Sequence, residues 1–453
     1  MAAIDNSAIR PARLATPIIT DARAFQLFLV TATIVALPLN WFLGTSLIWI
    51  FGVSAFLAFG IVRLSLPEWQ LVTVVGALLM SLLLAMIMDY QGQRALAALY
   101  NIALLLIFIL FINHGRQIDN AARTRRGTWP KDAVYRAAFY AYLAYVFYMV
   151  VVQAWIAATG TIRYSFDALL LGRIPGLPGI LELYVDNVVV DSDWIAGAMQ
   201  SRIHGMGVYA TESAMQVVLL GLMAVIYLIR KRRYGWAIAA ELSILPMLIP
   251  FGSRTTGLAY VASLLLVATL WRGGLKLAAI LLGPMIVAGL LFFASDIVTG
   301  IESMAQSVAD ARAGSTETRF ATYQIAIGMV LDQNLLMGLG IKPFNEVNPA
   351  VPIGSHSSVV SVFTRAGLIG LILFLAYYAT LLARIAAVQL ISLSRGAFLT
   401  IESRLEMACL SRIVLVVLVW CLTEDLDAPI YHAALSGLAI GIFWNMSERL
   451  RKA

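Results

Sequence analysis

The sequence predicts an all-α polytopic membrane protein with about twelve transmembrane helices and two long loops on the same side of the membrane. Hydrophobic residues make up 61% of the 453-residue chain, and only 13% of the residues are charged, whereas ordinary soluble domains carry about 25%. Apolar runs of about 20 residues, long enough to cross a bilayer, recur along the whole chain. This composition excludes an ordinary soluble domain.

Short polar segments separate the predicted helices, so the whole chain, 1–453, is expected to form a single transmembrane domain. The predicted spans lie near residues 25–43, 46–62, 69–88, 95–112, 137–158, 208–229, 235–251, 255–271, 275–294, 366–385, 406–423 and 429–446.

Positive charge sets the predicted orientation. The basic loop at 113–136, the run RKRR at 230–233 and the C-terminal SERLRKA all fall on one side, which the positive-inside rule identifies as the cytoplasm. The N-terminal residues carry three arginines and lead into an apolar span without a small-residue cleavage site. Both termini are therefore expected in the cytoplasm. The basic inner face follows the membrane rule, so no nucleic-acid partner is expected.

Two long segments, 159–207 and 295–365, are expected outside. The first contains a cluster of Pro and Gly that marks turns, and its stretch LPGILELYV at 177–185 is interpreted as a short interfacial helix. In the second, residues 316–332 begin with a Thr and Glu helix-start signal and continue with apolar residues at helical spacing. This pattern predicts an amphipathic helix on the outer surface, within the loop where we place the chemistry.

Arg254 follows a predicted break in the seventh span, where Pro246, Pro250 and Gly252 interrupt the helix near its outer end. Two interpretations stay open. The guanidinium either snorkels to lipid headgroups, or it faces a cavity and binds an anionic group, because charge within a membrane is costly and is usually retained for a function.

Arg202 and Glu212 flank the start of the sixth span. Arg202 is either a topological flank without a further role or an anion-binding group, and the sequence favours neither. Glu212 lies about one turn into the span and could pair with an outer arginine, which would satisfy a buried charge. The neighbouring His204 is interpreted as structural.

His356 is one of four histidines and lies in a Pro and Gly turn just before the tenth span. A lone loop histidine is usually inert, but Arg319 belongs to the same loop, and an imidazole beside a cation suits proton transfer next to an anionic leaving group. The acidic cluster Glu424, Asp425 and Asp427 could bind a metal or sugar hydroxyls, but a solvated turn is the favoured interpretation. No metal-binding spacing, phosphate-binding loop or dinucleotide motif is present, so neither metal nor cofactor is expected.

Four short motifs occur in a particular order: GSRTTGLAYV after a broken span, then TRFATYQIAI, GLG and SHSSVV before the last helices. This combination resembles the bacterial O-antigen ligase and polysaccharide polymerase superfamily of integral membrane glycosyltransferases, over about 202–370. The chain departs from the family pattern at Ser357, where Asn is typical, and at Thr255, where Gly is typical.

The resemblance implies an architecture like that of the GT-C glycosyltransferases, in a bacterial inner membrane, with the active site at the periplasmic face. It assigns His356 as the catalytic base or orienting group. The residues it implies for the donor diphosphate are Arg202, Arg254 and Arg319, and those in supporting positions are Glu212, Ser253, Ser357 and Tyr323.

The implied activity is transfer of a glycan from an undecaprenyl-diphosphate carrier, without metal or nucleotide sugar. We expect a polymerase that joins lipid-linked repeat units into O-antigen or exopolysaccharide. The alternative acceptor is lipid A core, which would make the protein an O-antigen ligase. Membrane lipid, a glycan acceptor, a flippase and a chain-length regulator are the partners this activity suggests.

An alternative of another class is a transporter or flippase for a lipid or solute. It predicts inverted repeats and ionisable residues near the midplane of several helices. The sequence instead concentrates its unexplained arginines near two outer loops and shows no repeat, so we favour the enzyme.

Overall fold

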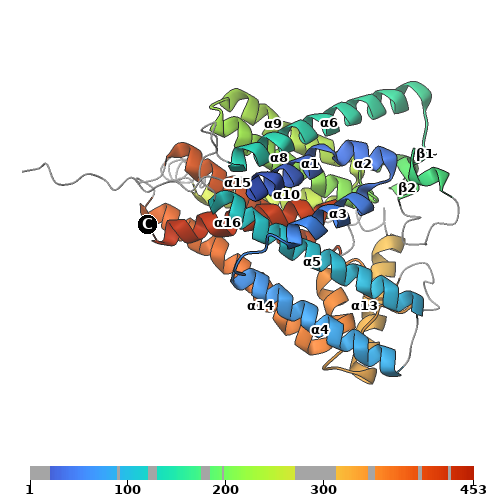
Figure 1. Ribbon diagram of the computed structural model, residues 1–453. Helices are drawn as coiled ribbons and strands as arrows, with labels where there is room; N and C mark the ends of the chain where they lie inside the picture. Colours follow the sequence, from blue (N-terminus) through green and yellow to red (C-terminus); the bar gives the residue numbers. More distant parts are fainter. Residues whose placement is uncertain are drawn as a thin grey trace, which may run out of the picture.

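A computed structural model shows a mostly helical molecule in which long helices run between two ends (Figure 1). We call the end that carries the strands the sheet end and the other the C-terminal end. The structure describes residues 21–88, 92–120, 130–174, 184–195, 198–270, 313–344, 352–395, 400–426 and 430–452.

The elements follow in chain order. They are α1 (Asp21–Val35), α2 (Leu37–Leu43), α3 (Ser46–Ala58), α4 (Leu66–Met88), α5 (Gly92–Asn120), α6 (Pro130–Thr159), β1 (Tyr164–Asp167), η2 (Leu171–Arg173), β2 (Asp186–Ile195), β3 (Ala198–Ile203), α8 (Ala210–Arg230), α9 (Tyr234–Leu248), η3 (Ile249–Phe251), α10 (Arg254–Leu270), α13 (Ala313–Gln333), α14 (Ser358–Arg395), α15 (Ile401–Trp420) and α16 (Ile430–Lys452).

Six of the described helices are long and apolar enough to cross a membrane, namely α4, α5, α6, α8, α14 and α9 with its η3 extension. A seventh span results if α1 and α2 count as one, bent by 62°. Pro38 in the first turn of α2 removes a helical N–H at this bend. The number twelve stays a prediction, and the span expected at 275–294 lies outside the described residues.

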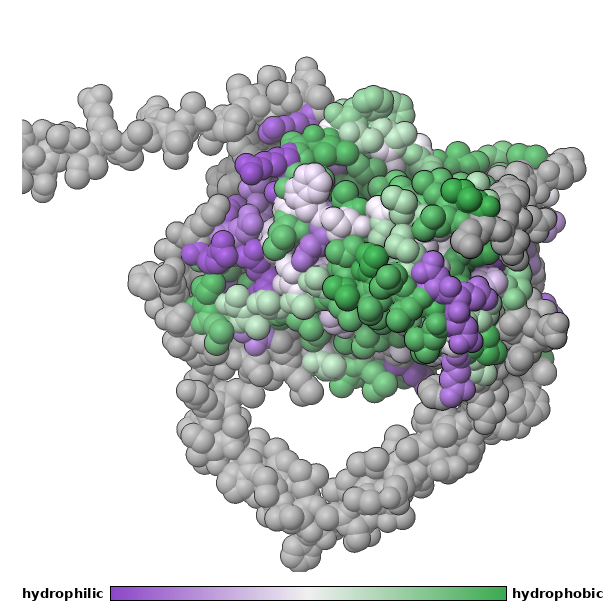
Figure 2. All heavy atoms as spheres, turned by 90° about the horizontal axis from the view of Figure 1, so that it is seen from below, coloured by the Kyte–Doolittle hydropathy of each residue, from purple (hydrophilic) through white to green (hydrophobic). Residues whose placement is uncertain are grey.

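The surface agrees with a membrane protein. Figure 2 shows one face on which apolar residues form a broad area between hydrophilic residues toward the two ends. Long side chains on lipid-accessible helices are strongly exposed, as Ile87 (81%) and Phe147 (71%) show. A soluble protein rarely exposes such large contiguous apolar patches, whereas lipid tails cover them without cost.

Helix α8 forms the centre of the bundle. It contacts α6, α9 and α15, and 94% of the residues in its most apolar stretch are buried inside the protein. A helix that is apolar on all sides is stable only where other elements cover every face, which is the case here. Its N-terminal end at Ala210 is therefore a fixed point on which the loops of the sheet end are built.

Close packing of α5 against α16 depends on small residues. A Cβ atom at Gly441 would lie 2.0 Å from the Ile112 carbonyl oxygen, and one at Gly437 would lie 2.6 Å from the Phe108 carbonyl oxygen. The two backbones approach this closely only because these positions lack side chains, as is common between membrane helices.

The first long loop forms a three-stranded antiparallel sheet with the order β1-β2-β3, so the all-α prediction was wrong for this segment. The sheet is tied to the bundle by Asn187, whose Nδ2 donates to the Trp41 carbonyl oxygen at 2.9 Å. The β-branched run VVV at 188–190 favours a strand, but turn signals lie close to it and no regular alternation of apolar and polar residues follows, which explains the missed strands. The interfacial helix expected at 177–185 falls largely outside the described residues.

The second long loop contains α13, which confirms that residues 316–332 are helical. After α13, the segment 335–340 crosses α14 at a break. Gly367 there has φ 58° and ψ −153°, a conformation open essentially only to glycine. N–H groups of the 335–340 segment donate to the freed carbonyls of Thr364 and Arg365 at 2.8 and 2.9 Å, and two N–H groups after Gly367 donate back. The break thus leaves these backbone groups satisfied, as a membrane helix requires.

Candidate active site

His356 lies at the N-terminal end of α14, in a backbone conformation that few side chains adopt. Its φ is +67°, and Gly354, two residues earlier, has φ +70°. The next residue, Ser357, is the N-cap of the helix: its hydroxyl accepts from the Val360 N–H at 3.4 Å. Ser and Asn are equally good N-caps, so the departure from the family's Asn at this position preserves the cap.

The main chain of His356 is held from two sides. Its N–H donates to Asp425 Oδ2 at 3.3 Å, and its carbonyl oxygen accepts from the Tyr323 hydroxyl at 2.6 Å. The imidazole itself remains 37% exposed, and its Nδ1 lies 3.7 Å from Glu424 Oε2. At this distance the two side chains form an ion pair whenever the ring is protonated. The backbone is therefore fixed while the ring edge stays accessible.

Asp425 is not part of a solvated turn, so that interpretation was wrong. Its side chain is 9% exposed and pairs with Lys342 Nζ at 2.9 Å. Burial by itself would raise the pKa of this carboxyl, but Lys342, Arg365 and His356 hold the pKa below its usual value. Within the described residues Asp425 Oδ1 has no hydrogen-bond partner. Asp425 is thus a buried anion that fixes the His356 turn.

Ser358 fastens the start of α14 to the turn between α15 and α16. Its N–H donates to the carbonyl oxygens of Cys421 and Glu424 at 2.9 and 3.1 Å. Its hydroxyl donates to the Glu424 carbonyl at 2.8 Å and accepts from the Leu426 N–H at 2.7 Å. Two loops far apart in sequence therefore form one rigid unit around His356.

Helix α13 brings Tyr323 to this unit and carries Arg319 one turn earlier, at the spacing of residues on the same helix face. The side chain of Arg319 lies outside the described residues, so its predicted role remains untested.

The break predicted in the seventh span is confirmed. Helix α9 contains Pro246, continues as η3 and ends at Gly252, which has φ +61°. Ser253 follows, buried, with its hydroxyl 2.8 Å from the Thr256 hydroxyl, and the exposed Arg254 begins α10. Arg202 in β3 donates from Nε to the Phe251 carbonyl oxygen at 2.6 Å. The structure thus brings the Arg202 strand to the segment that carries Ser253 and Arg254.

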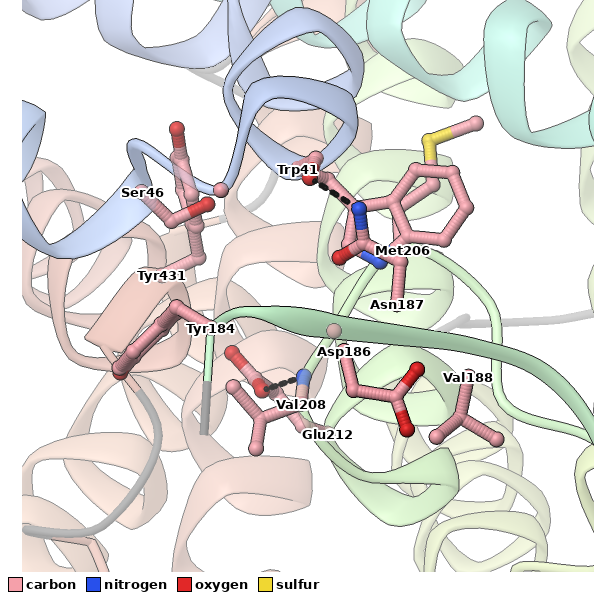
Figure 3. Close-up of a pocket in the computed structure, with 12 residues that line it drawn as sticks. Trp41, Ser46, Tyr184, Asp186, Asn187, Val188, Met206, Val208, Glu212 and Tyr431 are labelled. Carbon is pink, nitrogen blue, oxygen red and sulfur yellow. Dashed lines mark hydrogen bonds between the residues drawn. The ribbon is translucent and has the colours of Figure 1, made fainter. Parts of the chain in front are cut away.

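Glu212 is buried, and among the described residues it has no arginine partner. Its carboxylate accepts from the Val208 N–H at 2.8 Å (Figure 3) and from Gln216 Nε2 at 2.9 Å. In the same connection, the pKa of Tyr209 is raised by loss of solvent and by the negative charges of Glu212 and Asp425. The connection into α8 therefore lies within electrostatic reach of the His356 unit.

Sequence reasoning missed the Lys342 and Asp425 pair. One signal was present: Lys342 is the only lysine between Lys276 and Lys452, and it lies in a loop predicted to be outside, where basic residues are in the minority. Within the described ranges no group of three or more His, Cys, Asp or Glu side chains is arranged to hold a metal ion.

Taken together, the fold and this site define a polytopic membrane protein whose polar loops meet at one end of the bundle. Residues 242–375 match the family model described as O-Antigen ligase, a segment that contains Arg254, Arg319, Tyr323 and His356. The match supports assignment of the chain to the O-antigen ligase and polymerase superfamily and confirms the resemblance predicted from its motifs. Comparison with curated proteins gave no match.

Proposed function

We propose that the protein is a glycosyltransferase of the bacterial inner membrane that acts at the periplasmic face, with both termini in the cytoplasm. It transfers a glycan from an undecaprenyl-diphosphate carrier to a sugar hydroxyl of another lipid-linked repeat unit. The observation that carries this proposal is the fixed position of His356, an accessible imidazole on a clamped backbone with a carboxylate at Nδ1. Members of the matched family are glycosyltransferase-like enzymes that act on lipid-linked glycans. The match therefore supports glycosyl transfer as the reaction class.

In the proposed step, the acceptor hydroxyl oxygen attacks the anomeric carbon of the donor sugar. The bond from that carbon to the diphosphate oxygen breaks, and the acceptor proton moves to Nε2 of His356. Glu424, 3.7 Å from Nδ1, stabilises the imidazolium that results. A positioned general base of this kind accelerates a reaction by about 10² to 10⁴-fold.

The departing diphosphate needs cationic partners, and we assign that role to Arg202, Arg254 and Arg319. Guanidinium groups bind phosphate oxygens in a bidentate manner, and such donors are strongest where water is excluded. Ser253 directly precedes α10, which begins with Arg254, and Ser357 caps α14 next to His356. Glu212 orders the connection into α8.

A transfer assay with purified protein in lipid nanodiscs tests the reaction. The donor is an undecaprenyl-diphosphate-linked oligosaccharide, with chelator present throughout. Longer lipid-linked glycans support the polymerase, and transfer to lipid A core supports the ligase instead. Absence of both products, with donor changing leaflet in vesicles, favours the transporter and contradicts the proposal.

The variants should separate chemistry from backbone strain. His356→Asn is preferable to His356→Ala, because Asn tolerates a positive φ and leaves the turn intact. We expect it to lower kcat by at least about 10²-fold. Arg254→Gln is paired with Arg163→Gln, an arginine at the sheet end whose side chain is 80% exposed. Only the former should impair transfer, and equal effects of the two would contradict the assignment of Arg254.

A further inference from the structure

Arg94 is a further arginine beside the His356 unit, and the sequence motifs did not single it out. It lies in the first turn of α5, at the sheet end of the bundle (Figure 1). Its Nε donates to the Lys342 carbonyl oxygen at 2.8 Å, and its guanidinium carbon lies 4.3 Å from the centre of the Phe344 ring. The segment that carries Lys342 and Phe344 therefore fixes this side chain from two directions.

The same segment connects Arg94 with the His356 turn. Lys342 pairs through its side chain with the carboxylate that accepts from the His356 N–H. The Pro343 carbonyl oxygen accepts from the Ile353 N–H at 2.9 Å, three residues before His356. Arg94 thus belongs to the same unit as His356. Both residues are described, and no hydrogen bond joins their side chains.

The positive charge of Arg94 has no counterion among the described residues. The first turn of α5 holds no acidic residue, and no carboxylate of the described ranges forms an ion pair with this guanidinium. The side chain is nevertheless half-buried. A cation near the N-terminal end of a helix also opposes the helix dipole. Charge in such surroundings at a membrane is costly and usually serves a ligand or a partner.

The guanidinium is oriented to bind an anion. Its Nε bond and the stacked Phe344 ring fix the plane of the group, and they leave the Nη1 and Nη2 edge for a ligand. This fork of N–H donors matches two oxygens of a phosphate group.

Apolar side chains accompany this cation along the same segment. Phe344 is 50% exposed, and Leu335 and Leu336 are exposed as well. The segment therefore offers a phosphate-binding group next to a surface that hydrocarbon tails can cover. A ligand that joins a phosphate to a long hydrocarbon chain matches both parts.

The proposed polymerisation uses two such ligands, because donor and acceptor are each linked to a carrier diphosphate. The donor diphosphate must contact the reacting anomeric carbon, since the bond between them breaks. The acceptor diphosphate stays attached, and the sugars of its repeat unit separate it from the attacking hydroxyl. Arg94 is held by the His356 unit without a hydrogen bond to the imidazole, which fits the acceptor diphosphate.

We propose that Arg94 binds a phosphate group of the lipid carrier that bears the acceptor glycan, with Phe344 holding its guanidinium in place. The assignment to the acceptor rests on the proposed transfer reaction, whereas phosphate binding by Arg94 does not. Such a site distinguishes a polymerase from a ligase, because a lipid A core acceptor has no polyprenyl carrier.

Native mass spectrometry of the full-length protein measures lipid binding directly. The probes are undecaprenyl diphosphate, undecaprenol and phosphatidylglycerol. Arg94→Gln removes the charge, and Arg94→Lys keeps the charge but lacks the fork of donors. Arg384→Gln is the matched control. Arg384 also stacks on an aromatic ring, that of Trp444 at 3.9 Å, but Glu448 lies 3.9 Å from it.

We expect Arg94→Gln to weaken binding of one undecaprenyl diphosphate about tenfold, and Arg94→Lys to weaken it less. Arg384→Gln should not change it, and undecaprenol binding should be the same in all variants. Equal diphosphate binding by the native protein and Arg94→Gln overturns the inference, and so does an Arg94→Lys variant as weak as Arg94→Gln. If phosphatidylglycerol binding depends equally on Arg94, the site belongs to phospholipid headgroups and the inference is also overturned.

The transfer assay then separates acceptor from donor. The acceptor has a C-glycosyl phosphonate link, so it cannot act as a donor, and the accepting hydroxyl of the donor is blocked. Arg94→Gln should raise the KM for this acceptor about tenfold and leave the KM for donor unchanged. The KM for the methyl glycoside of the same repeat unit, which has no phosphate, should also stay unchanged.

The failures of the two proposals are distinguishable. If Arg94→Gln raises the methyl glycoside KM as much, its role is structural, and the inference is refuted while the proposed function stands. A rise in the donor KM alone contradicts the acceptor assignment. Binding of undecaprenyl diphosphate that depends on Arg94, without any glycan transfer, supports the phosphate site and refutes the proposed function.

Discussion

The Lys342 and Asp425 pair allows a quantitative test of what holds the His356 turn. Both side chains are less than one tenth exposed, and their charged atoms are 2.9 Å apart. Removing one partner of a buried pair strands the other charge and typically costs about 3–5 kcal/mol. The 3.3 Å bond from the His356 N–H to Asp425 is long and contributes at most about 1 kcal/mol, so the ion pair dominates.

The perturbation is a double-mutant cycle with Lys342→Met, Asp425→Asn and the double variant K342M/D425N. Each single change should destabilise the protein by about 3–5 kcal/mol. The double variant leaves no stranded charge, so its loss should fall short of the sum of the single losses by about 2–3 kcal/mol.

Reversible unfolding of the solubilised protein by sodium dodecyl sulfate, followed by circular dichroism, measures these losses. Arg163→Met with Asp191→Asn is the control cycle, because this pair is 3.6 Å apart and its side chains are 80% and 41% exposed. Its coupling should be below about 1 kcal/mol. Additive losses in the Lys342 and Asp425 cycle would refute the reasoning, since they would mean that the two charges do not depend on each other.

Three further predictions concern the same end of the molecule. Gly367→Ala should destabilise the protein by at least about 2 kcal/mol in the same unfolding assay, because its Cβ would lie 2.5 Å from the Leu336 carbonyl group at a φ of +58°. Tyr323→Phe removes the 2.6 Å hydrogen bond to His356 and should cost about 1 kcal/mol, with kcat lowered and donor KM unchanged in the transfer assay. Because the pKa of Asp425 is lowered on folding, its ion pair stabilises the protein above the usual Asp pKa of about 3.9 and loses this effect as pH falls through the lower folded value. The coupling free energy of the Lys342 and Asp425 cycle, measured in the same unfolding assay, should therefore not change between pH 7 and 5.

Helices were predictable because apolar length and proline breaks act locally. The interruption around Pro246 and Gly252 and the helix that carries Tyr323 follow from neighbouring residues alone, and both are found. The GLG motif was singled out from its pattern, but its physical reason is a contact. A Cβ atom at Gly338 would lie 2.5 Å from the Gly367 nitrogen, and no sequence period records that crossing.

The environment of the site was harder to predict because it depends on pairing between distant segments. Asp425 lies among acidic residues in the sequence, and this pattern predicts a solvated turn. The fold instead brings Lys342, which is 83 positions earlier, beside it. Glu212 was expected to find an arginine, yet backbone and amide donors from its own connection satisfy it. Burial of a charge is a property of the fold, so the sequence alone placed Asp425 in solvent, and it placed Glu212 beside a partner that the described residues do not provide.

The break at Gly367 divides α14 into two parts with different attachments. The short part before the break is held by the turn at 421–426, and the 335–340 segment bonds to both parts, after which the long part runs on toward Arg395. Bilayers of different thickness change the tilt of long membrane helices. Because the 335–340 segment is bonded on both sides of Gly367, a change in the tilt of the long part is passed to the short part and to the His356 turn, so turnover should vary with the acyl-chain length of the surrounding lipid.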